Sequence, residues 1–209
     1  MAEPARSREA EGPADSLENA PILRYPFQVQ GDLSQTPFAA PAILDIVAAI
    51  GLAIGGALGL AGTFAGRAEL RESLWMIDGM AIVVATALLT MKYQRQGNDC
   101  VAAGFLTFAV GEGLILAGNA AGLEASVPSY VGGICLWAAA LIMVSAPRTF
   151  GLWMRLTAIV AAVLFAVSAG LILWGAPLLP TSAPLPALGY PFLVLTFVGW
   201  IWTLLKPAR

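Results

Sequence analysis

Six long apolar runs follow one another along the chain from residue 42 onward. A helix of about 20 apolar residues spans the hydrocarbon core of a bilayer. Lipid offers no hydrogen bonds to the backbone, so only helices and closed barrels cross it, and these runs lack the two-residue alternation of barrel strands. We therefore predict an all-α membrane protein that forms a six-helix transmembrane bundle. The predicted spans are Ala42–Ala65, Ser73–Met91, Cys100–Ala121, Val127–Ala146, Phe150–Gly175 and Pro186–Leu205.

The first forty residues have a different composition from the rest of the chain. Charged residues make up only 11% of the whole sequence, against about a quarter in soluble domains, yet many of them lie in this segment. It lacks the apolar core of a signal peptide, and Pro21, Pro26, Pro37 and Pro41 interrupt any helix over residues 21–41. We expect residues 1–40 to form a disordered or interfacial cytosolic N-terminal tail, and residues 41–209 to form the six-helix transmembrane domain.

The distribution of Lys and Arg predicts the orientation. One side of the predicted bundle carries only Arg67 and Arg71, in a loop that also holds two glutamates. The other side carries Arg6, Arg8, Arg24, Lys92, Arg95, Arg148, Lys206 and Arg209. Positive charge favours the cytoplasmic side, so we expect a multi-pass protein of a bacterial inner (cytoplasmic) membrane with both termini in the cytoplasm. The tryptophans lie mostly near span ends, as an aromatic belt requires, and Trp137 is the mid-span exception.

A short sequence repeat relates two of the predicted spans. Residues 108–118 and 165–175 are identical at eight of eleven positions, and a fainter copy lies at 55–62. The spacing predicts three repeated helical hairpins. This layout, and nothing else in the chain, resembles the small bacterial membrane proteins typified by the acid-resistance protein HdeD, so no residue role is carried over.

Ionisable residues inside the predicted spans are the best functional candidates. A charged carboxylate at the bilayer centre costs about 2.5–3.5 kcal/mol even on the milder scale, so Glu112 should face the bundle interior and be protonated or paired. Asp78 lies five residues from the outer end of its predicted span and Glu112 nine, which separates their depths by about 6 Å. Asn119 lies two turns beyond Glu112 on the same face, where it would line an outer vestibule.

Three interpretations of these residues remain open. In the functional one, Asp78, Glu112 and Asn119 form an ion or proton site. In the second, both carboxyls are neutral acids bonded to nearby backbone, Ser or Thr. In the third, Glu112 has Arg155 as its ion-pair partner, although Arg155 is near enough to the cytoplasmic end to extend toward the headgroups.

Gly51, Gly55 and Gly59 form overlapping GxxxG units in the first span. Small residues at this spacing allow helix backbones to approach closely. We expect this face to serve helix packing, either inside the bundle or between protomers. If the face packs between protomers, the expected partners are a second copy of the chain, which gives a homo-oligomer, or other membrane proteins.

The sequence offers no support for an enzyme. The chain has no His, no CxxC pair and no G-x-S-x-G motif, so we expect no catalytic residue, no metal site and no cofactor. No basic stripe indicates nucleic acid, which leaves the lipid bilayer and membrane proteins as partners. The first function hypothesis is a structural, stress-related or assembly factor that binds other membrane components. The alternative is a small proton- or cation-linked transporter or channel component that uses Glu112 and Asp78.

Overall fold

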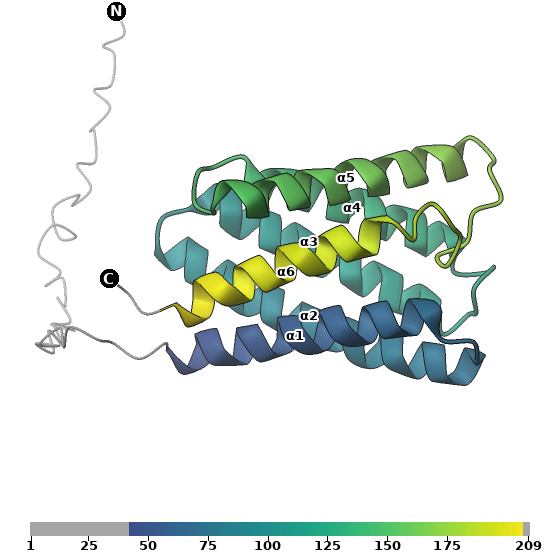
Figure 1. Ribbon diagram of the computed structural model, residues 1–209, viewed down its shortest axis with the longest axis horizontal. Coiled ribbons are helices and arrows are strands. Elements are labelled where there is room, and N and C mark those ends of the chain that lie inside the picture. Colours follow the sequence, from purple (N-terminus) through teal and green to yellow (C-terminus); the bar gives the residue numbers. More distant parts are fainter. Residues whose placement is uncertain (1–41, 207–209) are drawn as a thin grey trace, which may run out of the picture. The chain divides into compact units, whose positions relative to one another are not determined.

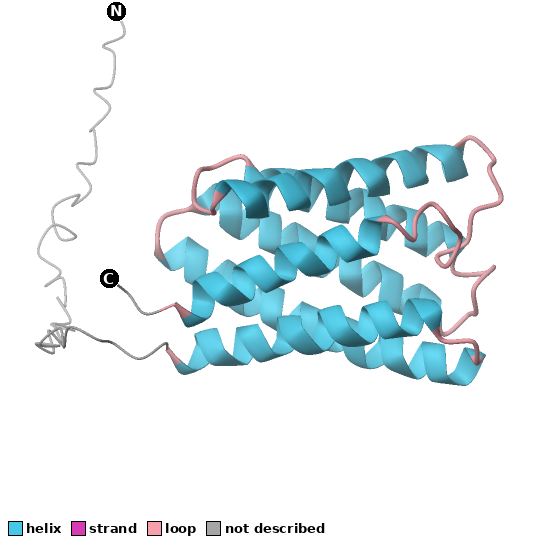
Figure 2. Cartoon of the chain, in the orientation of Figure 1, coloured by secondary structure: helices cyan, strands magenta, loops and turns pink. Residues whose placement is uncertain are grey.

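A computed structural model describes residues 42–206 of the chain. Within that range the protein is all-helical, with six helices and no strand (Figure 2). The predicted N-terminal tail lies outside the described residues. The helices are α1 (Ile43–Phe64), α2 (Ala68–Arg95), α3 (Asp99–Asn119), α4 (Val127–Ser145), α5 (Leu152–Leu173) and α6 (Gly189–Leu205).

Five of these helices, α1 to α5, are long and apolar enough to cross a membrane. The outward faces of the bundle are also apolar, and large side chains such as Val84, Val110 and Val163 are more than half exposed on them. Water would disfavour such a surface, whereas lipid accepts it. The chain is therefore a multi-pass membrane protein. The sixth helix is apolar but has only 17 residues, which extend about 25 Å at 1.5 Å per residue.

The six helices close into a ring. Each helix packs against its neighbours in sequence, and α6 returns to pack against α1 (Figure 1). The α1–α2, α3–α4 and α5–α6 connections lie together at one end, which we name the distal end. The proximal end is where α1 begins and α6 ends. A closed ring leaves a central space that side chains must fill.

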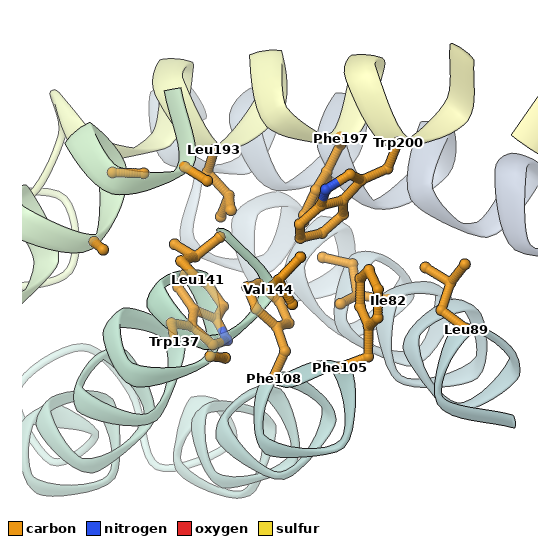
Figure 3. Close-up of a cluster of buried hydrophobic side chains, with 14 of the residues drawn as sticks. Ile82, Leu89, Phe105, Phe108, Trp137, Leu141, Val144, Leu193, Phe197 and Trp200 are labelled. Atoms are coloured by element: carbon orange, nitrogen blue, oxygen red, sulfur yellow. The ribbon is translucent and has the colours of Figure 1, made fainter. Parts of the chain in front are cut away.

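Aromatic side chains fill the proximal half of that space. Phe105 stacks on Tyr93, with 5.6 Å between ring centroids, and meets Trp200 edge-on at 4.8 Å. Phe150 and Phe108 also contact Trp200, and Figure 3 labels Phe105, Phe108 and Trp200 of this group. We name these five residues the aromatic plug. Because Tyr93 is 4% exposed and the other four 5% or less, the plug seals the ring at its proximal end.

The structure moves several predicted helix boundaries, and the largest shifts are in α2, which also ends four residues later at Arg95, and in α6. Helix α2 begins at Ala68, five residues earlier than the predicted span, because charged residues at a bilayer surface do not stop a helix. Helix α6 begins at Gly189, three residues later than predicted. The α5–α6 connection folds toward the centre instead, and its Pro180 carbonyl accepts a hydrogen bond from the Tyr190 hydroxyl at 3.1 Å.

Candidate functional site

A cavity occupies the distal half of the ring, opposite the aromatic plug. Five helices and the α5–α6 connection form its wall. It is partly open, and extends from Thr63, Asn119 and Pro180 near the distal end to Trp137 and Phe197 near the middle of the bundle. The space open to water-sized molecules is about 50 Å³. One water requires roughly 10–15 Å³ of such space, so the cavity has room for several waters or a small ligand.

Asp78 and Glu112 both line this cavity. Asp78 is 9% exposed and Glu112 3% exposed. Asp78 Oδ1 and Glu112 Oε2 are buried and have no hydrogen-bond partner among the described residues. Glu112 also lies against Gly79, the residue that follows Asp78 in α2. A buried acceptor without a partner is costly, and two adjacent ones indicate a position that a donor or a cation completes.

Glycines create the space for both carboxyl groups. A Cβ atom on Gly59 would stand 2.6 Å from Asp78 Oδ2, and one on Gly79 would stand 2.7 Å from Glu112 Oε1. Gly79 follows Asp78 directly in α2, so the Glu112 carboxyl lies against the same turn that carries Asp78. A Cβ at Gly59 would therefore push on the Asp78 carboxyl group alone, whereas one at Gly79 would press on both the Leu116 side chain and the Glu112 carboxyl group.

The predicted glycine face serves packing inside the bundle. Gly51 faces Ala81 and Ala85, Gly55 faces Ile82, and Gly59 faces the Asp78 side chain, so this face of α1 packs on α2 of the same chain.

The structure brings three of the predicted polar residues together and leaves one apart. Asn119, 8% exposed, lines the distal part of the cavity with Asp78 and Glu112. Arg155 does not reach Glu112. Its Nε donates to the carbonyl of Ser145 at 2.6 Å, at the C-terminal end of α4. Neither the Arg155 pairing nor a bond to Ser or Thr therefore satisfies the Glu112 carboxyl in this structure.

Helix α2 begins earlier than predicted, so Asp78 lies farther from the start of its helix than the predicted span implied. Asp78 is ten residues from the first residue of α2, and Glu112 is seven from the last residue of α3. These spacings correspond to about 15 Å and 10 Å along the helices. Measured from these helix ends, Asp78 is the farther of the two by about 5 Å, and it is the shared cavity that brings the two side chains together.

Sequence reasoning missed the aromatic wall of the cavity. Trp75, Tyr130, Trp137 and Tyr190 line it, and the two tyrosine hydroxyls lie 2.9 Å apart in a hydrogen bond. Trp137 stacks on Phe108, with 5.2 Å between centroids, and its buried Nε1 has no partner among the described residues. The only signal in the sequence was the mid-span position of Trp137, since a tryptophan there cannot belong to an interfacial belt.

One ion pair occurs among residues 42–206, far from this cavity. Lys92 Nζ lies 2.8 Å from Asp45 Oδ1, at the proximal end. Among the described residues no basic side chain lines the cavity itself, and the Arg71 guanidinium lies over the ring of Trp75, which does line it. The two carboxyl groups therefore have no fixed counter-charge from the cavity wall.

Comparison of the chain with protein-family models, with curated proteins and with solved structures gives no match. The chemistry of the cavity is therefore the evidence that bears on function.

Proposed function

We propose that the protein is a small proton- or cation-linked transporter or channel component, in which Asp78 and Glu112 bind the proton or cation. The observation that carries this proposal is the unpartnered pair of buried carboxyl groups in a partly open cavity. A structural or assembly role needs no such pair. The glycine face that would serve an assembly role is also occupied, because α2 of the same chain covers it.

The energetics favour uptake of positive charge. An isolated charge at the centre of a membrane helix costs about 2.5–3.5 kcal/mol, and the cavity holds two acids that share one environment. A bound proton or cation removes much of this cost. The cavity therefore favours a positively charged ligand over a neutral or anionic one.

Access to the site is from the distal end, because the aromatic plug closes the proximal end. In a transporter, the aromatic plug and the distal mouth of the cavity would open alternately. In a channel component, opening of the plug would connect the cavity to the proximal side. Either step requires Phe105 and Trp200 to separate, since their rings meet at 4.8 Å. This one-sided access is the arrangement that a carrier adopts before it releases its ligand to the opposite side.

We further propose that α6 is a sixth span, that the membrane is a bacterial inner membrane, and that both termini are cytoplasmic. The charges of the described helices support this orientation. Lys92, Arg95, Arg148 and Lys206 lie at the proximal end, whereas the distal end combines Arg67 and Arg71 with acidic residues. The cavity then opens away from the cytoplasm. Three repeated hairpins remain a proposal, supported by the sequence identity between residues 108–118 and 165–175.

The test is labelling of the purified protein with a hydrophobic carbodiimide, which attacks protonated carboxyl groups in apolar surroundings. We expect labelling that declines at high pH and disappears in Glu112→Gln. Glu124→Gln is the matched control, because Glu124 is exposed in the α3–α4 connection, and it should label like the wild type. Vesicles containing Glu112→Gln should also lose pH-dependent cation flux. Unchanged labelling and flux in a folded Glu112→Gln variant would refute the proposal.

A further inference from the structure

We infer that the cavity binds a small alkylammonium ion, a substrate class that rests on and sharpens the proposed function. Its N–H groups donate to Asp78 and Glu112. Its carbon chain packs on the aromatic wall, which is formed by Trp75, Tyr130, Trp137 and Tyr190.

The acceptor atoms define the charged end of this ligand. Asp78 Oδ1 and Glu112 Oε2 are buried acceptors that no described group supplies with a hydrogen. A primary ammonium carries three N–H donors in a compact head, so one head can donate to both carboxyl groups. Such charge-assisted hydrogen bonds are roughly twice as strong as neutral ones. A quaternary ammonium has the same charge but no donor, so it would leave both oxygens unpartnered.

The aromatic residues define the apolar end. Five aromatic side chains line the cavity, namely the four above and Phe197, and together with Leu60 and Val194 they make the wall mostly apolar. Aromatic faces attract cations and pack well on alkyl groups. The Tyr130–Tyr190 hydrogen bond and the Tyr190 bond to the Pro180 carbonyl hold two of these rings in fixed positions. The wall is therefore preformed for an organic body and has no need to rearrange around it.

The same features argue against a metal ion as the ligand. Hard cations such as Ca²⁺ and Mg²⁺ take six or more oxygen ligands. Among residues 42–206 no group of three or more His, Cys, Asp or Glu side chains is arranged to hold a metal. Two carboxyl groups in an aromatic wall cannot replace a full hydration shell, whereas they can pair with one ammonium head.

An acidic groove, lined also by Met76 and Ile77, adjoins the cavity at the distal end. Glu69, Glu72 and Ser73 of α2 line this groove, and Asn119 lines both the groove and the cavity. Acidic surfaces raise the local concentration of cations. Arg71 belongs to the same turn, but its guanidinium lies over the Trp75 ring at 5.7 Å and does not line the groove. The approach to the cavity therefore favours the positive charge that the carboxyl pair binds.

The test compares binding of propylammonium, tetramethylammonium, Na⁺ and K⁺ to the purified full-length protein in detergent. Tryptophan fluorescence is the readout because Trp75 and Trp137 line the cavity, and thermal unfolding provides a second readout. We expect propylammonium to reach half-saturation at a concentration at least tenfold below those of the other three ions. Glu112→Gln and Asp78→Asn should each raise that concentration at least tenfold, and Glu124→Gln should leave it unchanged.

Four outcomes would overturn the inference. If tetramethylammonium binds as tightly as propylammonium, N–H donors are not what the site recognises. If Na⁺ or K⁺ binds more tightly than propylammonium, the site takes inorganic cations, and the proposed function survives while this inference does not. Binding of propylammonium that is unchanged in both carboxyl variants would place it elsewhere on the protein. If no cation binds and the carbodiimide also fails to label Glu112, the proposed function fails as well.

Discussion

Substitution of Gly59 by Ala should weaken ligand binding while leaving the bundle folded. The new Cβ would stand 2.6 Å from Asp78 Oδ2, whereas ordinary contact begins at 3.4 Å, so the carboxyl must retreat by about 0.8 Å. Binding sites need their groups within about 0.5 Å of the productive position. We therefore expect the half-saturating concentration of propylammonium to rise roughly tenfold.

The cost to folding should be small, because the clash involves the end of one side chain. Overpacking costs about 1–3 kcal/mol, while replacing a helical Gly by Ala returns about 1 kcal/mol. The free energy of unfolding in detergent should therefore fall by no more than about 2 kcal/mol. Unfolding with increasing SDS, followed by circular dichroism, measures this quantity on the same preparation that is used for binding.

Two other glycines provide matched controls for Gly59→Ala. A Cβ on Gly51 would meet the Ala81 backbone oxygen at 2.8 Å and the Ala85 Cβ at 2.9 Å, and neither atom can move without separating α1 from α2. Gly51→Ala should therefore lower stability more than Gly59→Ala. Gly113 has open space at its Cβ position, so Gly113→Ala should leave binding unchanged and raise stability by about 1 kcal/mol at most. Wild-type binding by Gly59→Ala, or equal stability of the Gly51 and Gly59 variants, would refute this reasoning.

Two further predictions concern the plug and the orientation. Trp200→Ala removes a buried ring of the aromatic plug and should lower the free energy of unfolding by about 3–5 kcal/mol. Trp202→Ala is the control and should have little effect, because the Trp202 side chain is 66% exposed. Equal losses of stability in the two variants would contradict a sealed proximal end. In a variant without native cysteines, Gln96→Cys should react with an impermeant thiol reagent only from the cytoplasmic side and Ala125→Cys only from the opposite side. The reverse pattern would invert the proposed topology.

The apolar runs alone were sufficient to predict six helices, because a backbone in lipid must satisfy its hydrogen bonds within each segment. The interior placement of Asp78 and Glu112 also followed from the sequence, since exposing either carboxyl to lipid is costly. The start of α2 did not follow. Hydropathy indicates where lipid begins, and a helix such as Ala68–Arg95 continues into the polar region beyond it.

Only the tertiary structure decided which helix faces meet. The sequence left the partner of Gly51, Gly55 and Gly59 open, and the structure assigns them to α2. Tyr130 and Tyr190 lie sixty positions apart, yet they form one hydrogen-bonded pair in the cavity wall. Lipid tails are as apolar as the helices, so the choice among neighbours depends on shape and polar contacts rather than on hydrophobicity. Hydropathy along one chain carries no information about that fit, which is why the ring, the plug and the cavity were visible only in three dimensions.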